Sequence, residues 1–384
     1  MEYHIPEELK PVMAQVRAEY AAAGAQFLKR EYLLAFQEKT GAFSRHFPQV
    51  LAAAEALPAD AVVYAMFLSR AMVDRATFLR RLPEIRIPDE KHPFLGLLAF
   101  LPQMEELFDW MRAREIPDDV IHATVGQFED CLDLYQERFG RLGMNKRYFD
   151  HMQRYVDHKI LNVGRLRFEP HHLADACVAE HRSSGVRQVF LAEGQFGKTG
   201  LSADTPPVFP DSPVHNAFFR ETEDSFEGTP VNDCGRCSST ILRLDRKDWF
   251  LRVPVGSLCL SVHIPPTGVL SREACAESYQ RAIEVFRPLF PDERIVAFTC
   301  KSWMMAPELK EFLKPDSRIL AFQEPYLKYP IPSRGRDIFN FVFKEKSADC
   351  DYASLPEKTS LQRALKNHYL AGGYLYEYGG ILPL

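Results

Sequence analysis

Three polar residues near the ends of predicted strands have the chemistry of a base or a nucleophile. His263 lies at the end of an apolar strand pattern, Glu169 closes an alternating pattern, and Ser302 lies near the end of a third pattern. Imidazole and carboxylate groups can take a proton from an attacking nucleophile, and open α/β sheets bind ligands at the carboxyl ends of their strands. We therefore predict His263 or Glu169 as a catalytic base. The alternatives are a hydrogen-bonded structural histidine and a surface or salt-bridged glutamate.

Ser302 would meet His263 as a nucleophile beside its base if their strands are neighbours, as the short crossover between them implies. No Gly-x-Ser-x-Gly turn surrounds Ser302, however, so a serine hydrolase is the weaker hypothesis. The alternative is that Ser302 caps the end of its strand and Trp303 packs beneath the site.

Two further motifs resemble known sites only in part. Residues 192–199 fit a loose phosphate-binding loop, but the Pro-containing stretch after them cannot form the helix that such a loop needs. Cys234 and Cys237 have the spacing of half a zinc site, and no second pair exists. We predict a flexible loop, bystander thiols and no metal.

The elements that must position these residues occur in a strand, loop, helix, strand order. Ser271 has the position of an N-cap, and a helix start that follows a strand is a natural site for a phosphate group. We predict that the loop and the helix start bind the cofactor through Ile264, Pro265, Gly268, Ser271 and Arg272. The predicted elements are strand 258–264, helix 271–286, strand 294–303, short helix 307–313, and strands 319–326 and 337–343.

A chain of 384 residues is expected to form two domains. Apolar positions at helical spacing predict an all-helical N-terminal domain over 1–158, with about five to seven helices. From 159 to 384, alternating patterns predict strands, among them 164–169, ending at Pro170, and 186–191. A proline-rich loop is expected over 204–213, and a capped helix beginning near Thr359 precedes a Gly- and Tyr-rich end that we expect to pack the C-terminus.

Composition narrows the class of protein. A formal charge of −5 and a pI near 6.2 argue against a nucleic-acid binder that relies on phosphate contacts. The acidic start lacks the features of a signal peptide, and the longest apolar run, 94–102, is too short to span a bilayer. Eight scattered cysteines suit reduced thiols. We expect a cytoplasmic protein without membrane or nucleic-acid partners.

Taken together, several segments of the second half resemble a family of mostly uncharacterised bacterial proteins that join a helical N-terminal domain to a GNAT-like acyltransferase C-terminal domain. The resemblance covers most of residues 160 to 373. The matching pieces are Gly164–Glu169, Val262–Pro265 with Gly268 and Leu270, Ser302–Trp303 with Pro307 and Leu309, Ser317–Phe322, and Leu355–Pro356 with Thr359–Arg363.

The resemblance implies an α+β protein whose all-helical domain is followed by a GNAT-like mixed β-sheet domain with flanking helices. It also implies a sheet that opens between strands 258–264 and 294–303 to admit an acyl thioester. Attack by an amine is direct, so a base and an acid suffice. The spaced glycines of the usual GNAT pyrophosphate loop are absent here, with only Gly268 before Ser271, so both acyl-CoA and an acyl carrier protein remain candidate donors.

Our leading hypothesis is an acyltransferase that moves an acyl group from such a thioester to a small-molecule or peptide amine. We place Arg165, Arg167, Trp303 and Tyr326 in its substrate pocket. The alternatives are a GNAT-derived binding or scaffolding protein without catalysis and, less favoured, a serine hydrolase that uses Ser302.

Overall fold

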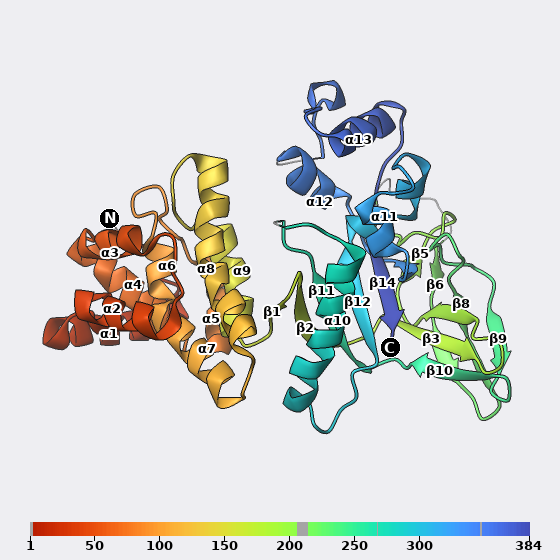
Figure 1. The fold of residues 1–384 in the computed structure, drawn as a ribbon, viewed down its shortest axis with the longest axis horizontal. Coiled ribbons are helices and arrows are strands. Elements are labelled where there is room, and N and C mark those ends of the chain that lie inside the picture. Colours follow the sequence, from red (N-terminus) through yellow and green to blue (C-terminus); the bar gives the residue numbers. More distant parts are fainter. Residues whose placement is uncertain (1–2, 206–213, 267, 346–347) are drawn as a thin grey trace. The chain divides into compact units, whose positions relative to one another are not determined.

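The computed structural model describes residues 3–205, 214–266, 268–345 and 348–384. The proline-rich loop predicted over 204–213 lies almost wholly outside the described residues. The chain divides into two compact units, Met1–Val163 and Gly164–Leu384, whereas the sequence places the boundary between residues 158 and 159. Each unit is described by itself below (Figure 1).

The N-terminal unit is helical. One predicted apolar stretch is divided, because Pro102 stands in the first turn of a new helix and α6 ends at Ala99. The prediction of about five to seven helices was therefore too low for the described residues. They are α1 (Lys10–Ala23), α2 (Arg30–Thr40), α3 (Phe47–Glu55), α4 (Ala59–Ala71), α5 (Arg75–Arg81), α6 (Leu95–Ala99), α7 (Leu101–Ala113), α8 (Asp118–Phe139) and α9 (Lys146–Val156), followed by the short strand β1 (Leu161–Val163).

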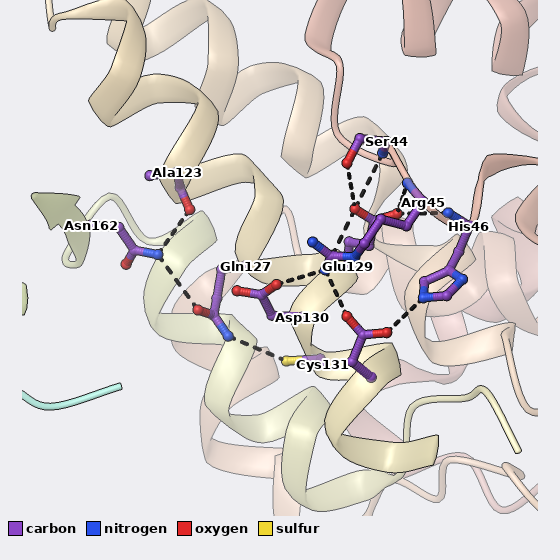
Figure 2. Close-up of polar contacts among 10 residues, drawn as sticks. Ser44, Arg45, His46, Ala123, Gln127, Glu129, Asp130, Cys131 and Asn162 are labelled. Atoms are coloured by element: carbon purple, nitrogen blue, oxygen red, sulfur yellow. Dashed lines mark hydrogen bonds and ion pairs between the residues drawn. The ribbon is translucent and has the colours of Figure 1, made fainter. Parts of the chain in front are cut away.

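A buried carboxylate on α8 fixes the start of α3 (Figure 2). Glu129 is 2% exposed. One of its oxygens accepts from the backbone N–H groups of Arg45 and His46 at 2.6 and 2.8 Å, and the other accepts from the N–H and hydroxyl of Ser44 at 3.2 and 3.0 Å. Because these N–H groups precede or begin a helix, they have no helical acceptor of their own. Glu129 thus ties α8 to α3.

Within the described residues, no helix taken singly has the length and apolar character needed to cross a bilayer. Only α3 and α4 together reach the required length and composition, and a bend of 117° separates them.

The first sheet of the C-terminal unit is mixed, as the sequence predicts. Its strands lie in the order β2-β11-β12-β14-β13. β11 runs parallel to β12 and antiparallel to β2, and β14 is antiparallel to both of its neighbours. Helix α10 (Arg272–Phe286) lies along one face (Figure 1). The strands are β2 (Leu166–His172), β11 (Leu258–His263), β12 (Ala297–Ser302), β13 (Leu327–Pro330) and β14 (Tyr378–Pro383).

A second, antiparallel sheet packs on the other face of the first. Cys259, Ala297 and Ile381 of the first sheet share a buried cluster with Val178 and Leu191 of the second. The second sheet has the order β10-β3-β4-β8-β7, with β9 paired to β8. Its strands, with those of a small separate ladder of β5 and β6, are β3 (Ala176–His181), β4 (Arg187–Leu191), β5 (Gln195–Phe196), β6 (His215–Asn216), β7 (Phe219–Glu221), β8 (Ser225–Pro230), β9 (Leu242–Asp245) and β10 (Trp249–Val253).

Two predicted strands are wrong. Residues 318–323 form α11 (Arg318–Gln323), and residues 336–343 form α12 (Arg336–Ile338) and a π-helix (Phe339–Phe343). Short apolar runs do not distinguish a strand from a buried helix. Here Phe339 and Phe343 both pack on Tyr369 of α13 (Ser360–Leu370), which begins at the predicted cap, Thr359.

Proline and glycine misled the prediction at two strands. β2 continues through Pro170 to His172, although the sequence ends it there. β14 was not predicted, because Gly379 and Gly380 suggest a break. In fact a side chain at Gly379 would lie 2.3 Å from the ring of Tyr329, so glycine is what lets the neighbouring strand β13 pack there.

Candidate active site

The central feature of the site is the parting of two parallel strands. β11 and β12 pair over only three rows, from Cys259 with Ala297 to Ser261 with Thr299. Beyond that row β11 stays paired to β2 as far as His263, and β12 stays paired to β14 as far as its own end. The two strands are therefore no longer paired with each other towards their carboxyl ends, which is where the resemblance implies an opening. We call this unpaired region between β11 and β12 the wedge.

The backbone of Val262 faces this wedge. Pro170 has no N–H, so the pair it makes with Leu260 is not a hydrogen-bonded one, and the N–H and C=O of Leu260 point to β12. The carbonyl of Leu258 also points to this side, because it accepts from the N–H of Val296, the residue before β12, at 3.1 Å. Alternation along the strand then directs the N–H and C=O of Val262 to the same side. The N–H lies level with the carbonyl of Thr299 in the last paired row, and the C=O lies beyond that row.

Two predicted residues meet at the mouth of the wedge. His263 Nε2 lies 3.1 Å from Glu169 Oε2, across the antiparallel pair of β11 and β2. The two side chains are 31% and 16% exposed. Both are thus partly shielded yet reachable, and an imidazole held by a carboxylate has the arrangement of an oriented base.

A second row of polar contacts lies on the same face and was missed by the sequence analysis. His171 Nε2 lies 2.7 Å from the hydroxyl of Thr299, which stands in the last paired row of β11 and β12. Burial, with a smaller effect from the cation of Lys301, lowers the pKa of His171. His171 thus reaches from β2 across β11 and ties it to β12 just before the wedge opens.

Lys301 and Asp175 form the remaining part of that face. Lys301 Nζ lies 2.7 Å from Asp175 Oδ2, and the hydroxyl of Tyr329 donates to the same carboxylate at 3.3 Å. A signal for Lys301 was present in the sequence, because it is a lone cation two residues beyond Thr299 on a largely buried strand. Asp175 had no such signal, since it lies in a loop between strands.

The opposite face of the wedge is covered by α10. Tyr279 of α10 packs on Phe168 and Phe298, and its hydroxyl lies 2.8 Å from that of Tyr326. Tyr326 is 2% exposed and Trp303 is 9% exposed. The structure thus places these two predicted pocket residues in the core, because the helix and the short turns after β12 enclose them.

Ser302 does not stand beside His263. Its side chain accepts from the N–H of Met304 at 3.1 Å and caps a 3-10 turn (Trp303–Met305). Thr299 and Lys301 share the face of His263, so Ser302, the next residue, points to the opposite face. The nucleophile–base pair considered for a hydrolase is therefore not formed, and the capping alternative describes Ser302.

Arg165, which was predicted in the substrate pocket, instead holds the predicted cofactor loop. The Arg165 guanidinium donates to the carbonyls of Pro265, Gly268 and Val269 at 3.1 to 3.2 Å. Thr267 lies outside the described residues. Ser271 caps α10, as predicted, through Ala274 N–H.

Arg272 and Ile264 were also predicted to bind the cofactor, and the structure places them in different surroundings. Arg272 forms an exposed ion pair with Glu324, so a ligand would have to compete with that carboxylate. Ile264 directly follows β11 and is partly buried, which places it at the start of the loop.

The partial motifs are not completed by the fold. Phe196 lies in a short strand and Gly200 bonds to Cys237, so no helix follows the glycine-rich loop. Cys237 Sγ lies 3.5 Å from His215, while Cys234 is exposed. No group of three or more His, Cys, Asp or Glu side chains suited to a metal occurs among the described residues.

Lys328, on β13, is a lysine whose pKa is lowered. Burial, with a smaller effect from Lys310, lowers its pKa to about 8. It lies level with Gly380 on the neighbouring strand β14.

Comparisons with known proteins agree with this geometry. The family model of the GNAT-like C-terminal domain matches residues 160–382, and that of the N-acyltransferase N-terminal domain matches residues 46–148. A comparison with curated protein sequences finds no match.

Solved structures share the fold over the whole chain. An acyltransferase in complex with decanoyl-CoA is 17% identical, with 98% of this chain and 99% of that one covered and a TM-score of 0.57. Acyltransferase structures with decanoyl-CoA and teicoplanin, and with CoA and 10C-teicoplanin, are 18% identical at the same coverage, with TM-scores of 0.59. At this identity the likeness concerns the fold.

The parted sheet and the two domain matches define an enzyme of the GNAT-like acyltransferase class. The chain belongs to the family that joins an N-acyltransferase N-terminal domain to a GNAT-like C-terminal domain.

Proposed function

We propose that this enzyme transfers an acyl group from acyl-CoA to an amine, with the thioester held in the wedge between β11 and β12. The observation that carries the proposal is that these strands part directly beside the His263–Glu169 pair. The structural neighbours in complex with decanoyl-CoA and with CoA support the choice of donor.

The backbone of β11 has the means to activate the thioester. The N–H of Val262 lies at the closed end of the wedge, beside the carbonyl of Thr299. When a donor binds, this N–H would turn from that carbonyl to the thioester carbonyl and stabilise the negative charge that develops on its oxygen during attack. A backbone donor at this position requires no particular side chain, which is why the residue type gave no signal.

The acceptor amine approaches His263 from the strand end, where its side chain is 31% exposed. α10 and its aromatic contacts fill the opposite face, and the second sheet packs on the His263 face further back, at Cys259 and Ala297. His263 takes a proton from the amine as its nitrogen attacks the carbonyl carbon. The C–N bond forms and the C–S bond breaks. The imidazolium then returns the proton to the departing thiolate, so that CoA leaves as a thiol. Glu169 orients the ring and stabilises the imidazolium while it exists.

The phosphates of the donor would lie near the loop that Arg165 organises, at the N-terminus of α10, where free N–H groups favour an anion. Ser271 already satisfies one of those N–H groups. Gly268 has a φ of +81°, which keeps the loop close to Arg165.

The proposal is tested by titrating the purified chain with acyl-CoAs from acetyl to decanoyl in a calorimeter, and by following CoA release with a panel of amines. We expect saturable binding of at least one acyl-CoA and amine-dependent CoA release. Replacing Val262 by proline removes the N–H at the closed end of the wedge, so kcat should fall about 10²- to 10³-fold, while Val262→Ala retains activity.

Binding of no acyl-CoA, together with no thioester cleavage, would refute the proposal and favour a binding or scaffolding protein. Turnover with an acyl carrier protein but with no acyl-CoA would retain the transfer and reject CoA as the donor.

A further inference from the structure

Charged residues surround the mouth of the wedge in a pattern that the proposed transfer does not use. On β2, Arg167 lies directly across from His263 in the antiparallel pair. On β12, Lys301 lies two residues beyond Thr299, and His263 lies two residues beyond Ser261, the partner of Thr299. Extending that register places Lys301 opposite His263 across the wedge, on the same face of the sheet. Two cations thus flank the candidate base.

Arg167 has no carboxylate partner within the described part of the chain. Glu169, the acidic residue on the same face of β2, bonds to His263 instead. No ion pair to Arg167 is formed among the residues that the structure describes, and its Nε is buried without a hydrogen-bond partner. A buried charged donor without a partner costs free energy, so such a group in a partly open site suits a ligand that supplies the acceptor.

An ion pair with Asp175 positions Lys301 without occupying all of its hydrogen-bond donors. Its ammonium group has three N–H donors, and Asp175 takes one of them. Asp175 also accepts from Tyr329, which fixes the carboxylate on its other side. The Lys301 side chain is 51% exposed, so it retains donors that face solvent at the mouth of the wedge.

We propose that Arg167 and Lys301 bind a carboxylate of the acceptor, so that the substrate is an amino-acid-like amine whose carboxylate lies close to the nitrogen that is acylated. This inference rests on the proposed transfer. The cations stand beside the residue that deprotonates the amine. The donor's phosphates are a less suitable source of the anion, because they lie at the far end of the pantetheine arm from the thioester that the amine attacks.

The experiment compares pairs of acceptors that differ only in this group. The common α-amino acids and β-alanine are each assayed against their own carboxamides, with an acyl-CoA that the wild-type chain binds. A hydrogen bond to a charged group contributes about 1.5–3 kcal/mol, so we expect kcat/KM for the acid to exceed that for its amide by about 10- to 100-fold. The amide's amine loses its proton more readily, which biases the comparison against this result.

Variants assign the preference to the two residues. Arg167→Gln and Lys301→Gln should each lower kcat/KM for the acid about tenfold or more, mainly through its KM, so that the ratio of kcat/KM for the acid to that for the amide falls, and the KM of the donor should not rise. The control is Lys247→Gln, an exposed lysine in the turn between β9 and β10, which should behave as wild type. If a variant does not fold, the wild-type comparison of acid with amide still decides.

The outcomes separate this inference from the proposed function. Equal rates for acids and amides, or acylation only of amines without a carboxylate, would overturn the inference while leaving the transfer intact. A rise in the KM of the acyl-CoA, rather than of the acceptor, would assign the cations to the donor's phosphates and also overturn it. Donor binding with no acylation of either set counts against it as well. Only the absence of both donor binding and CoA release concerns the transfer itself.

Discussion

Replacing Glu169 by glutamine tests whether the pair at the mouth of the wedge acts as an oriented base. The substitution keeps the size of the side chain and removes its charge. In the folded chain Glu169 Oε2 lies 3.1 Å from His263 Nε2. The carboxylate therefore stabilises any positive charge that develops on the imidazole when His263 accepts a proton from the amine.

The size of the effect follows from this contact. A hydrogen bond to a charged group contributes about 1.5–3 kcal/mol, and the partial exposure of both side chains favours the lower part of that range. About 1.5–2 kcal/mol corresponds to a fall in kcat of about 10- to 30-fold. Removing the base itself, with His263→Ala, should cost about 10²- to 10⁴-fold.

The assay is steady-state CoA release for the single variants and the double variant. Because Glu169 acts through His263, adding Glu169→Gln to His263→Ala should cause little further loss. Glu180→Gln is a matched control: its carboxylate is 17% exposed and pairs with Arg187 at 2.8 Å in the second sheet, so it should not change kcat. A full additional loss in the double variant would refute the dyad. A larger effect of Glu169→Gln than of His263→Ala would make Glu169 the base.

Three further predictions concern stability. In Glu129→Gln an amide N–H₂ lies opposite backbone N–H groups that donate to a carboxylate oxygen in the wild-type chain. The free energy of unfolding in urea should therefore fall by about 2–4 kcal/mol, and an unchanged midpoint would contradict this role of Glu129. The pKa of Lys328 is lowered from its ordinary value of 10.5 to about 8 in the folded chain. Between these two pH values the unfolded chain therefore binds more protons than the folded chain, so stability rises with pH. Below about pH 8 Lys328 is charged in both states, and the destabilisation caused by its buried charge is fully present. Lys328→Met should therefore raise Tm near pH 7, and the gain should shrink towards pH 10; a gain that is independent of pH would reject this explanation. Gly379→Ala would bring a carbon to 2.3 Å from the Tyr329 ring, so thermal unfolding should reveal a loss of about 1–3 kcal/mol or more; Gly197→Ala, whose added carbon meets no atom within 4 Å, should cost less than half of that.

The sequence contained enough information to single out His263 and Glu169 as candidates, because both lie on polar faces of alternating strands near strand ends. It could not show that they meet, since 94 residues separate them. Pairing of β2 with β11 places them together, and strand pairing is a property of the whole sheet. The same holds for Lys301 and Asp175, which are 126 residues apart.

Residue types that normally break strands explain the largest errors in the sheet. Pro170 was taken as the end of β2, yet its missing N–H falls at a pair where none is needed. Gly379 was taken as a break, yet it is required by the ring of Tyr329. In both cases the residue's effect depends on its neighbour across the sheet, which the local pattern does not contain.

The wedge itself is produced by the outer partners of the two strands. β11 remains paired to β2 up to His263, and β12 remains paired to β14 up to Ser302. Each strand therefore follows a different neighbour after the last shared row, and the gap between them opens without disrupting either ladder. Because Pro170 sets the pairing of β2 with β11, the same residue that appeared to end a strand directs the backbone of Val262 to β12, at the point where the gap begins. The local sequence of β11 and β12 could not reveal the opening, since their divergence depends on residues of β2 and β14 that lie about a hundred positions away.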